Sequence, residues 1–168
     1  MGSSQWGALV FFAGGTVGAA KSSDAVDIFS VTTPTWFSTR LSVARYGLAA
    51  TSCQSTETVF FAGGQNVTES NVIDVFSVRV MGWVASLNLS VPRYFLAATS
   101  ALDLVFFAGG QNGTRPYAVV DILNATSSQW LPPTALSSAR MYLAAAASGN
   151  YAFFAGGNSF TMPSVVPI

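Results

Sequence analysis

Four copies of Phe-Phe-Ala-Gly-Gly constrain what this chain can fold into. They occupy residues 11–15, 60–64, 106–110 and 153–157, and consecutive copies begin 49, 46 and 47 residues apart. A nearly constant period of this length indicates a repeat architecture, in which each unit packs mainly against its neighbours. The repeat register therefore guides every other assignment.

Several other residue types recur in the same register. An aspartate precedes an apolar pair, a tryptophan follows it nine residues later, and an arginine then precedes an alanine-rich run. The in-register positions are Asp27, Asp74 and Asp121; Trp36, Trp83 and Trp130; Arg45, Arg93 and Arg140; and the pairs Gly14-Gly15, Gly63-Gly64, Gly109-Gly110 and Gly156-Gly157. Trp6 lies outside this register. We expect the three tryptophans to fill equivalent outer positions between units, so that Trp83→Ala destabilises severely and Trp6→Ala costs little.

Each repeat contains four short extended segments. We name them A (from the arginine), B (ending in Gly-Gly), C (from the aspartate) and D (around the tryptophan). Segment 58–62 is apolar on both alternating faces, so both faces need cover. Small residues in A, Phe in B and Trp in D suit units that are crowded near an axis and splayed outside. The predicted strands are 8–13, 25–31, 46–52, 58–62, 72–78, 94–100, 104–108, 118–123, 141–147 and 151–155.

Gly-Gly after an apolar strand, then a tryptophan, then an arginine before the next strand resembles the kelch repeat. Phe29, Phe76 and Leu123 stand where kelch repeats usually have tyrosine. The resemblance implies an all-β fold of four-stranded antiparallel propeller blades. It also implies a protein-binding module, since most kelch propellers are of that kind. A minority, similar to galactose oxidase, are copper enzymes with His and Tyr ligands, and this chain has no histidine.

The register divides the chain into one kelch-repeat domain with incomplete ends. We assign a partial blade to 1–40, blades to 41–88 and 89–135, and a partial blade to 136–168. The first repeat begins inside segment A and the last ends before segment C, which leaves about three and a half blades in a partial or open propeller. We expect either a fragment of a longer propeller or a chain that completes its ring with a second copy. Open ends favour association, because they expose apolar blade faces and unpaired strand edges.

Composition excludes several classes of function. Charged residues make up 8% of the chain, against about 25% in a typical domain, and the formal net charge is zero. No basic cluster is available for nucleic acid or an anionic membrane surface. One cysteine, Cys53, and no histidine exclude a zinc site and a Ser–His or Cys–His pair within the chain. We therefore expect no enzyme activity, metal or cofactor.

Two apolar or glycine-rich features have a simpler explanation than the function they suggest. Residues 7–20 could be read as a signal-peptide core, but the same run recurs inside the chain, so membrane insertion is not expected. Residues 15–22 vaguely resemble a phosphate-binding loop, with Ala20 where the second glycine belongs. The equivalent segments 65–71 and 111–118 are not glycine-rich, so the Gly-Gly is interpreted as a tight turn.

The arginines and aspartates that open segments A and C should lie at the same end of a blade. We expect structural ion pairing there, with Arg93 and Asp74 in one polar network. The alternative is a ring of arginines that lines a ligand-binding mouth.

Four sequons are present, at Asn66, Asn88, Asn112 and Asn124. Glycosylation suits a charge-poor extracellular or cell-surface protein, which is slightly favoured here. The alternative is a cytoplasmic Ser/Thr-rich chain in which these sites are never used.

The leading functional hypothesis is a protein-binding scaffold. In a propeller the D–A and B–C loops share one face, which makes residues 65–71, 111–118, 85–92 and 131–139 the expected contact surface. The candidate contact residues are Arg115, Pro116, Tyr117, Gln65 and Gln111. The alternative is part of a kelch-type secreted enzyme, an oxidase or a sugar-modifying enzyme, whose catalytic residues lie outside this segment.

Overall fold

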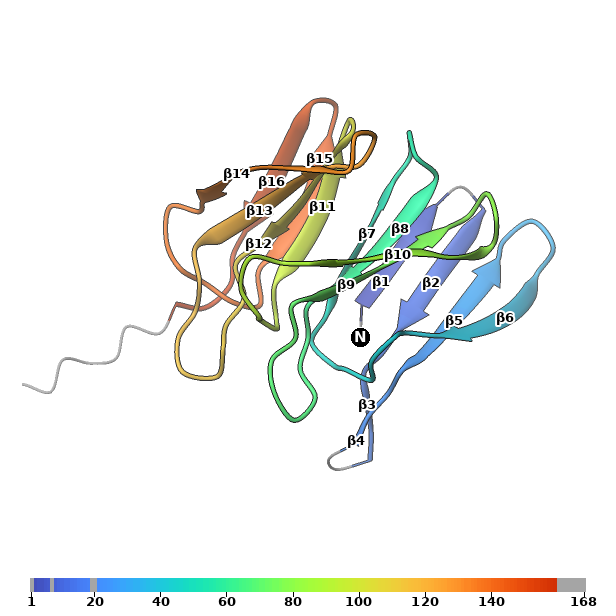
Figure 1. The fold of residues 1–168 in the computed structure, drawn as a ribbon, viewed down its shortest axis with the longest axis horizontal. Helices are drawn as coiled ribbons and strands as arrows, with labels where there is room; N and C mark the ends of the chain where they lie inside the picture. The colour runs from blue at the N-terminus through green and yellow to red at the C-terminus, as the bar shows by residue number, and fades with distance from the viewer. Residues whose placement is uncertain (1, 7, 19–20, 160–168) are drawn as a thin grey trace, which may run out of the picture.

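The computed structural model describes residues 2–6, 8–18 and 21–159, and within them the chain contains strands and no helix. Sixteen strands form three four-stranded antiparallel sheets, one two-stranded sheet and one small hairpin (Figure 1). The first sheet comprises β1 (Gly2–Trp6), β2 (Leu9–Ala13), β5 (Ala25–Ser30) and β6 (Thr35–Arg40). The second comprises β7 (Ala49–Cys53), β8 (Thr58–Ala62), β9 (Val72–Ser77) and β10 (Gly82–Asn88). The third comprises β11 (Ala97–Ala101), β12 (Leu104–Ala108), β13 (Val119–Asn124) and β14 (Gln129–Ala135). A fourth sheet has only β15 (Ala144–Ser148) and β16 (Tyr151–Ala155), and the small hairpin comprises β3 (Thr16–Val17) and β4 (Lys21–Ser22).

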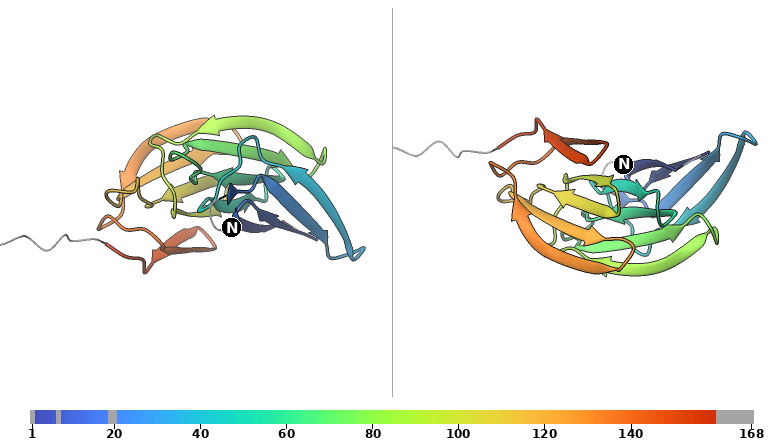
Figure 2. Two further views of the ribbon diagram at one scale, coloured as in Figure 1. Left: turned by 90° about the horizontal axis from the view of Figure 1, so that it is seen from below. Right: turned by 90° about the horizontal axis from the view of Figure 1, so that it is seen from above.

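Each four-stranded sheet is one blade, with its strands in the order A, B, C, D. Strands β7 and β11 lie side by side, as do β1 with β7 and β11 with β15, so the A strands form the inner layer. The D strands β6, β10 and β14 lie at the periphery, and the blades splay outward from the inner layer (Figure 2). The chain is thus a partial β-propeller, as the sequence predicted.

All ten predicted strands are present. The structure differs from the prediction in where the A strands begin and in one additional strand, β1. The A strands were predicted to begin at 46, 94 and 141, but they begin at Ala49, Ala97 and Ala144, because the three residues before each belong to loops. The segment 1–40, predicted as a partial blade, contains four strands, because β1 pairs with β2. Gly-Ser-Ser-Gln-Trp in β1 has no apolar alternation, so only its pairing identifies it as a strand.

The core lies between blades and is built by the two phenylalanines of each B strand. The first phenylalanine of each B strand faces the following blade, and the second phenylalanine faces the preceding blade. Phe11 therefore meets Phe61 at a ring-centroid distance of 6.2 Å, and Phe60 meets Phe107 at 6.4 Å. Because every internal blade is covered on both faces, the B strands can be apolar on both faces.

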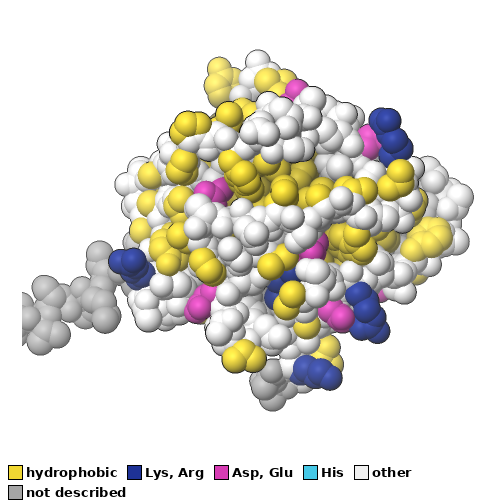
Figure 3. All heavy atoms as spheres, viewed as in Figure 1, with side chains coloured by type: hydrophobic (Ala, Val, Ile, Leu, Met, Phe, Trp, Pro, Cys, Tyr) yellow, Lys and Arg dark blue, Asp and Glu magenta, His cyan; other side chains and the backbone are white. Residues whose placement is uncertain are grey.

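The two outermost blade faces have no such cover among the described residues. Trp36, on the face of the first blade that points away from the second, is 62% exposed. Phe153, on the far face of β16, is 53% exposed, whereas the equivalent Phe60 is 3% exposed. In the space-filling view, hydrophobic side chains are exposed over much of the visible face, and charged ones are few and scattered (Figure 3).

The tryptophans occupy equivalent positions in the ladder but not equivalent environments. Trp36, Trp83 and Trp130 pair across to Phe29, Phe76 and Leu123. Of these three tryptophans, only Trp83 forms a recorded hydrogen bond to another blade. Its Nε1–H donates to Thr39 Oγ1 at 3.0 Å. The expectation that all three fill sites between blades is therefore wrong for Trp36, whose face is open. The side chain of Trp6 lies outside the described residues.

Candidate functional site

The D–A and B–C loops lie on one face of the propeller, as predicted from topology. Backbone hydrogen bonds join them: Tyr46 and Gln65 exchange two, at 2.9 and 2.8 Å, and the Arg93 N–H donates to Ser70 O at 3.1 Å. We call this the loop face, formed by the D–A loops 41–48, 89–96 and 136–143 and the B–C loops 63–71 and 109–118. Residues 85–88 and 131–135, which were assigned to the contact surface as loop, belong to strands β10 and β14.

The glycine pairs seat each D–A loop against the blade before it. Gly63 has φ 66° and Gly64 has φ 105°, in the left-handed region that favours glycine. A Cβ on Gly63 would lie 2.5 Å from the backbone oxygen of Arg93, and the Gly64 N–H donates to that same oxygen at 2.9 Å. The pair is therefore a turn that brings backbones into close contact, as the sequence predicted.

A buried ion pair stands beneath the loop face in each complete internal blade. Arg45 Nη2 donates to Asp74 Oδ2 at 2.9 Å and to Phe61 O at 3.0 Å, and the Ser42 N–H donates to the same carboxylate oxygen at 3.2 Å. Burial lowers the pKa of the Arg45 guanidinium, and the neighbouring Asp74 carboxylate opposes that shift. The Arg45 side chain is fully buried.

The third blade repeats this arrangement. Arg93 Nη1 donates to Asp121 Oδ2 at 3.0 Å, Arg93 Nη2 donates to Phe107 O at 3.0 Å, and the Ser90 N–H donates to Asp121 at 3.0 Å. The expected pairing of Arg93 with Asp74 is wrong, because each arginine pairs with the aspartate of its own blade and Asp74 belongs to the blade before Arg93. The alternative of an open arginine ring also fails for Arg45 and Arg93, because both side chains are 0% exposed.

Aromatic side chains gather on the loop face directly after these arginines. Phe95 and Tyr142 stack with centroids 4.2 Å apart, and Tyr46 lies 6.3 Å from Phe95. Phe95 and Tyr142 both have φ 56°, a left-handed conformation that costs aromatic residues of order 1–3 kcal/mol and that clusters at binding sites. Gly47 occupies the same position in the second blade, with φ 66°.

Backbone hydrogen bonds hold these left-handed residues in place. The Phe95 N–H donates to Gly47 O at 2.7 Å, and the Tyr142 N–H donates to Phe95 O at 3.0 Å. The Tyr94 ring lies beside Phe95. Burial raises the pKa of the Tyr94 phenol, and the neighbouring Tyr46, Glu69 and Tyr142 raise it further. Sequence reasoning missed this cluster, although an aromatic residue within two positions of each repeated arginine was a visible signal.

This aromatic cluster borders an open cavity of about 400 Å³. Tyr46, Phe95 and Tyr142 contribute aromatic lining, and Gly15 and Thr16 also line it. Tyr142 is 58% exposed, so one face of the stacked pair is accessible from solvent. The arrangement can hold an apolar or aromatic group by ring contacts; its lining has no charged side chain.

The predicted contact residues divide into exposed and structural ones. Arg115 is exposed, and its guanidinium lies 5.9 Å from the ring centroid of Tyr117. Gln111 is buried and bridges to Tyr94 and Pro116 through its backbone, so it is not a surface contact. Gln65 accepts a hydrogen bond from the Tyr46 phenol at 2.7 Å, which fixes that ring.

The sequon asparagines differ in accessibility. Asn66 and Asn88 are exposed. Asn112 Oδ1 accepts hydrogen bonds from the Thr114 and Arg115 N–H groups, and Asn124 Oδ1 accepts from Thr126 and Ser127, so these two also stabilise turns. Cys53 is buried, with its Sγ 3.3 Å from Ser55 Oγ.

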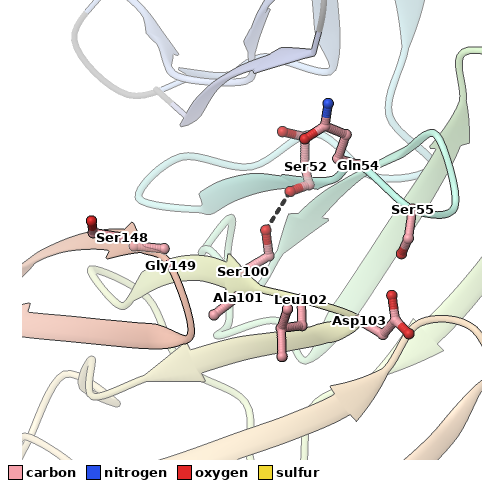
Figure 4. A pocket seen from close by; sticks show the side chains of 10 residues that line it. Ser52, Gln54, Ser55, Ser100, Ala101, Leu102, Asp103, Ser148 and Gly149 are labelled. Atoms are coloured by element: carbon pink, nitrogen blue, oxygen red, sulfur yellow. Dashed lines mark hydrogen bonds between the residues drawn. The ribbon is translucent and has the colours of Figure 1, made fainter.

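Another cavity lies at the opposite end of the blades, among the A–B loops (Figure 4). It measures about 760 Å³, and its polar lining includes Ser52, Gln54, Ser55, Ser100 and Asp103. Ser100 Oγ–H donates to the backbone oxygen of Ser52 at 2.6 Å. This lining has one carboxylate, that of Asp103. Elsewhere in the described part of the chain, no group of three or more His, Cys, Asp or Glu residues is placed to bind a metal ion.

Comparisons with known proteins bear on the fold alone. No protein-family model matches the chain, and no curated protein matches it. Among solved structures, the one described as "Structure of YjhT" superposes with a TM-score of 0.78 at 14% sequence identity, over 95% of this chain. The match spans 59% of the length of that other chain. In the described residues, no helix is long and apolar enough to cross a membrane.

Proposed function

We propose that this chain is a segment of a kelch-type propeller and acts as a protein-binding scaffold through its loop face. The observation that carries the proposal is the aromatic cluster, where Phe95 and Tyr142 keep a strained backbone conformation beside an open cavity. Strain of this kind persists where the surrounding structure enforces it, and such sites are frequently functional. Tyr and Phe at the centre of a low-charge surface are suited to anchor a partner side chain.

The periphery of the loop face supplies a second kind of contact. Arg115 and Tyr117 lie together on the third B–C loop, and Arg and Tyr are the residue types favoured at binding hot spots. An extended peptide that places an apolar or aromatic side chain against Tyr142 and an acidic or carbonyl group near Arg115 fits this arrangement. The kelch assignment rests on the in-register Gly-Gly, Trp and Arg positions and on the four-stranded blades.

The proposal is tested with peptides selected from a displayed random library against the folded chain. We expect Tyr142→Gly to weaken the selected peptides at least tenfold, because it removes the exposed ring and keeps the left-handed backbone that Gly47 adopts at the equivalent position. Arg115→Ala should also weaken them. Leu102→Ala, at an exposed position among the A–B loops, is the matched control and should leave affinity unchanged. Peptides sensitive to Leu102→Ala and indifferent to Tyr142→Gly would contradict the proposal.

A further inference from the structure

Among the described residues, the fourth sheet contains the A and B strands of a blade. Strand β16 pairs with β15 on one side. In the complete blades the other side of the B strand pairs with the C strand, with Phe61 opposite Asp74 and Phe107 opposite Asp121. Among the described residues no strand occupies that side of β16, so the edge opposite Phe154 is free.

The residues that hold the carboxylate in the complete blades are nevertheless present at the equivalent positions of the fourth blade. In the second and third blades the aspartate carboxylate accepts hydrogen bonds from an arginine side chain and from the backbone N–H of a serine. The serine lies three residues before that arginine in the sequence. Ser137 and Arg140 occupy these positions in the fourth blade. Arg140 is seated like Arg93, because its backbone oxygen accepts from Gly110 at 3.0 Å as that of Arg93 accepts from Gly64 at 2.9 Å.

Arg140 lacks the partner that its equivalents have. Arg140 forms no ion pair with any described residue, whereas Arg45 and Arg93 each pair with an aspartate. Its Nε is buried without a hydrogen-bond partner among the described residues, but so are the Nε atoms of Arg45 and Arg93, so the absent ion pair is what distinguishes Arg140. Arg140 is half-buried, and a half-buried guanidinium without a counter-ion favours a carboxylate placed beside it.

The apolar surface beside this edge also lacks its usual cover. In the first blade Phe11 packs against Phe76, which lies two residues after Asp74 on the C strand of the next blade, with ring centroids 5.6 Å apart. Phe11 and Phe60 are buried, whereas the equivalent Phe106 of the third blade is only partly buried. A C strand beside β16 would bring an apolar side chain to that position.

We propose that the free edge of β16, together with Arg140 and Ser137, is a strand-docking site for an extended polypeptide segment. The segment pairs antiparallel with β16 and carries an aspartate opposite Phe154, with an apolar or aromatic residue two positions later. Strand addition of this type gains affinity from backbone hydrogen bonds and specificity from side-chain sites. Here the aspartate sets the register, because a slip of one residue would move it to the other face of the sheet. Ser137 and Arg140 lie in the D–A loop 136–143 that also carries Tyr142, but the proposed contacts use the edge of β16 and not the aromatic rings.

A synthetic hairpin of residues 71–88, which spans β9 and β10, is a suitable probe. We expect the dye-labelled hairpin to bind the chain saturably by fluorescence anisotropy. An Asp74→Ala hairpin should bind at least tenfold more weakly, because it loses charge-assisted hydrogen bonds to the arginine. In the Arg140→Gln chain the two hairpins should bind with similar, weak affinity. Arg79→Gln, which changes an exposed arginine outside both proposed sites, is the control and should preserve the preference for the aspartate.

Circular dichroism and a melting curve establish that the Arg140→Gln chain is folded, and Arg140→Lys, which keeps the charge, should retain part of the preference. Equal affinity of the two hairpins for the wild-type chain, absence of saturable binding, or a preference that survives Arg140→Gln would overturn the proposal. A dimer that dissociates on Arg140→Gln and excludes the hairpin would also overturn it, and would identify a second copy as the occupant.

Discussion

Replacing Asp74 by alanine is expected to lower the free energy of unfolding by about 3–5 kcal/mol, because it leaves the buried Arg45 guanidinium without its counter-ion. The Arg45 Nε and Nη1 atoms already lack hydrogen-bond partners among the described residues, so the site has no spare acceptor to take over. Removing Asp74 also leaves the Ser42 N–H without its acceptor. Urea denaturation followed by tryptophan fluorescence measures the effect.

The pairing of each arginine with the aspartate of its own blade provides controls for this prediction. Asp27→Ala, at an exposed position of the same repeat register, should change stability by no more than about 0.5 kcal/mol. In double-mutant cycles, Arg45 and Asp74 should couple by more than about 0.5 kcal/mol, and Arg93 and Asp74 should be additive within that limit. Equal destabilisation by Asp27→Ala and Asp74→Ala would contradict the assignment of buried pairs within blades.

Trp83→Ala is expected to destabilise the chain by about 3 kcal/mol, the lower end of the range for a truncated core tryptophan, because the ring is half-buried. The ring packs against Phe61 and Phe76 with centroid distances of 5.8 and 5.2 Å, and its Nε1–H donates to Thr39 of the preceding blade. The substitution therefore opens the interface between the first two blades. Thermal and urea unfolding report the loss.

Trp36 provides the matched comparison, because it holds the same repeat position on the open face of the first blade. With 62% of its surface exposed, Trp36→Ala should cost less than about 1 kcal/mol. Trp83→Phe should recover part of the stability lost in Trp83→Ala. If Trp36→Ala lowered the stability as much as Trp83→Ala, the result would contradict the open outer face of the first blade.

The fold was predictable because the period carries most of the information. Nearly constant spacing of the Gly-Gly pairs, together with apolar residues on both faces of the B strands, required blades that cover one another. Strand β1 and the hairpin β3–β4 were not predictable in the same way, since neither has an apolar alternation. Strand β1 is defined by its pairing with β2, and the hairpin by the pairing of β3 with β4. The start of each A strand was misplaced by three residues, because a D–A loop that bridges to a B–C loop resembles a strand in sequence.

The site was less predictable, because sequence does not report the exposure of polar side chains. Gln111 and Gln65 follow the same Gly-Gly turn, but both are fixed by contacts with tyrosines of the loop face. The repeat register placed arginine and aspartate at the same end of a blade and left the choice of blade open, which is how Arg93 was assigned to Asp74. The left-handed conformation of Phe95 depends on the backbone hydrogen bond to Gly47 in the neighbouring blade, and no local pattern encodes it.

Amide hydrogen exchange, resolved by NMR for each residue, tests the blade architecture most directly. Strands β8 and β12 have a neighbour on both sides, so we expect slow exchange along their whole length; D strands β10 and β14 should be protected at alternate residues. In β16, the amides bonded to β15 should be protected, and those at the free edge should exchange at rates close to those of loops. Uniform protection along β16, or rapid exchange throughout β10 and β14, would contradict three complete blades followed by half of a fourth.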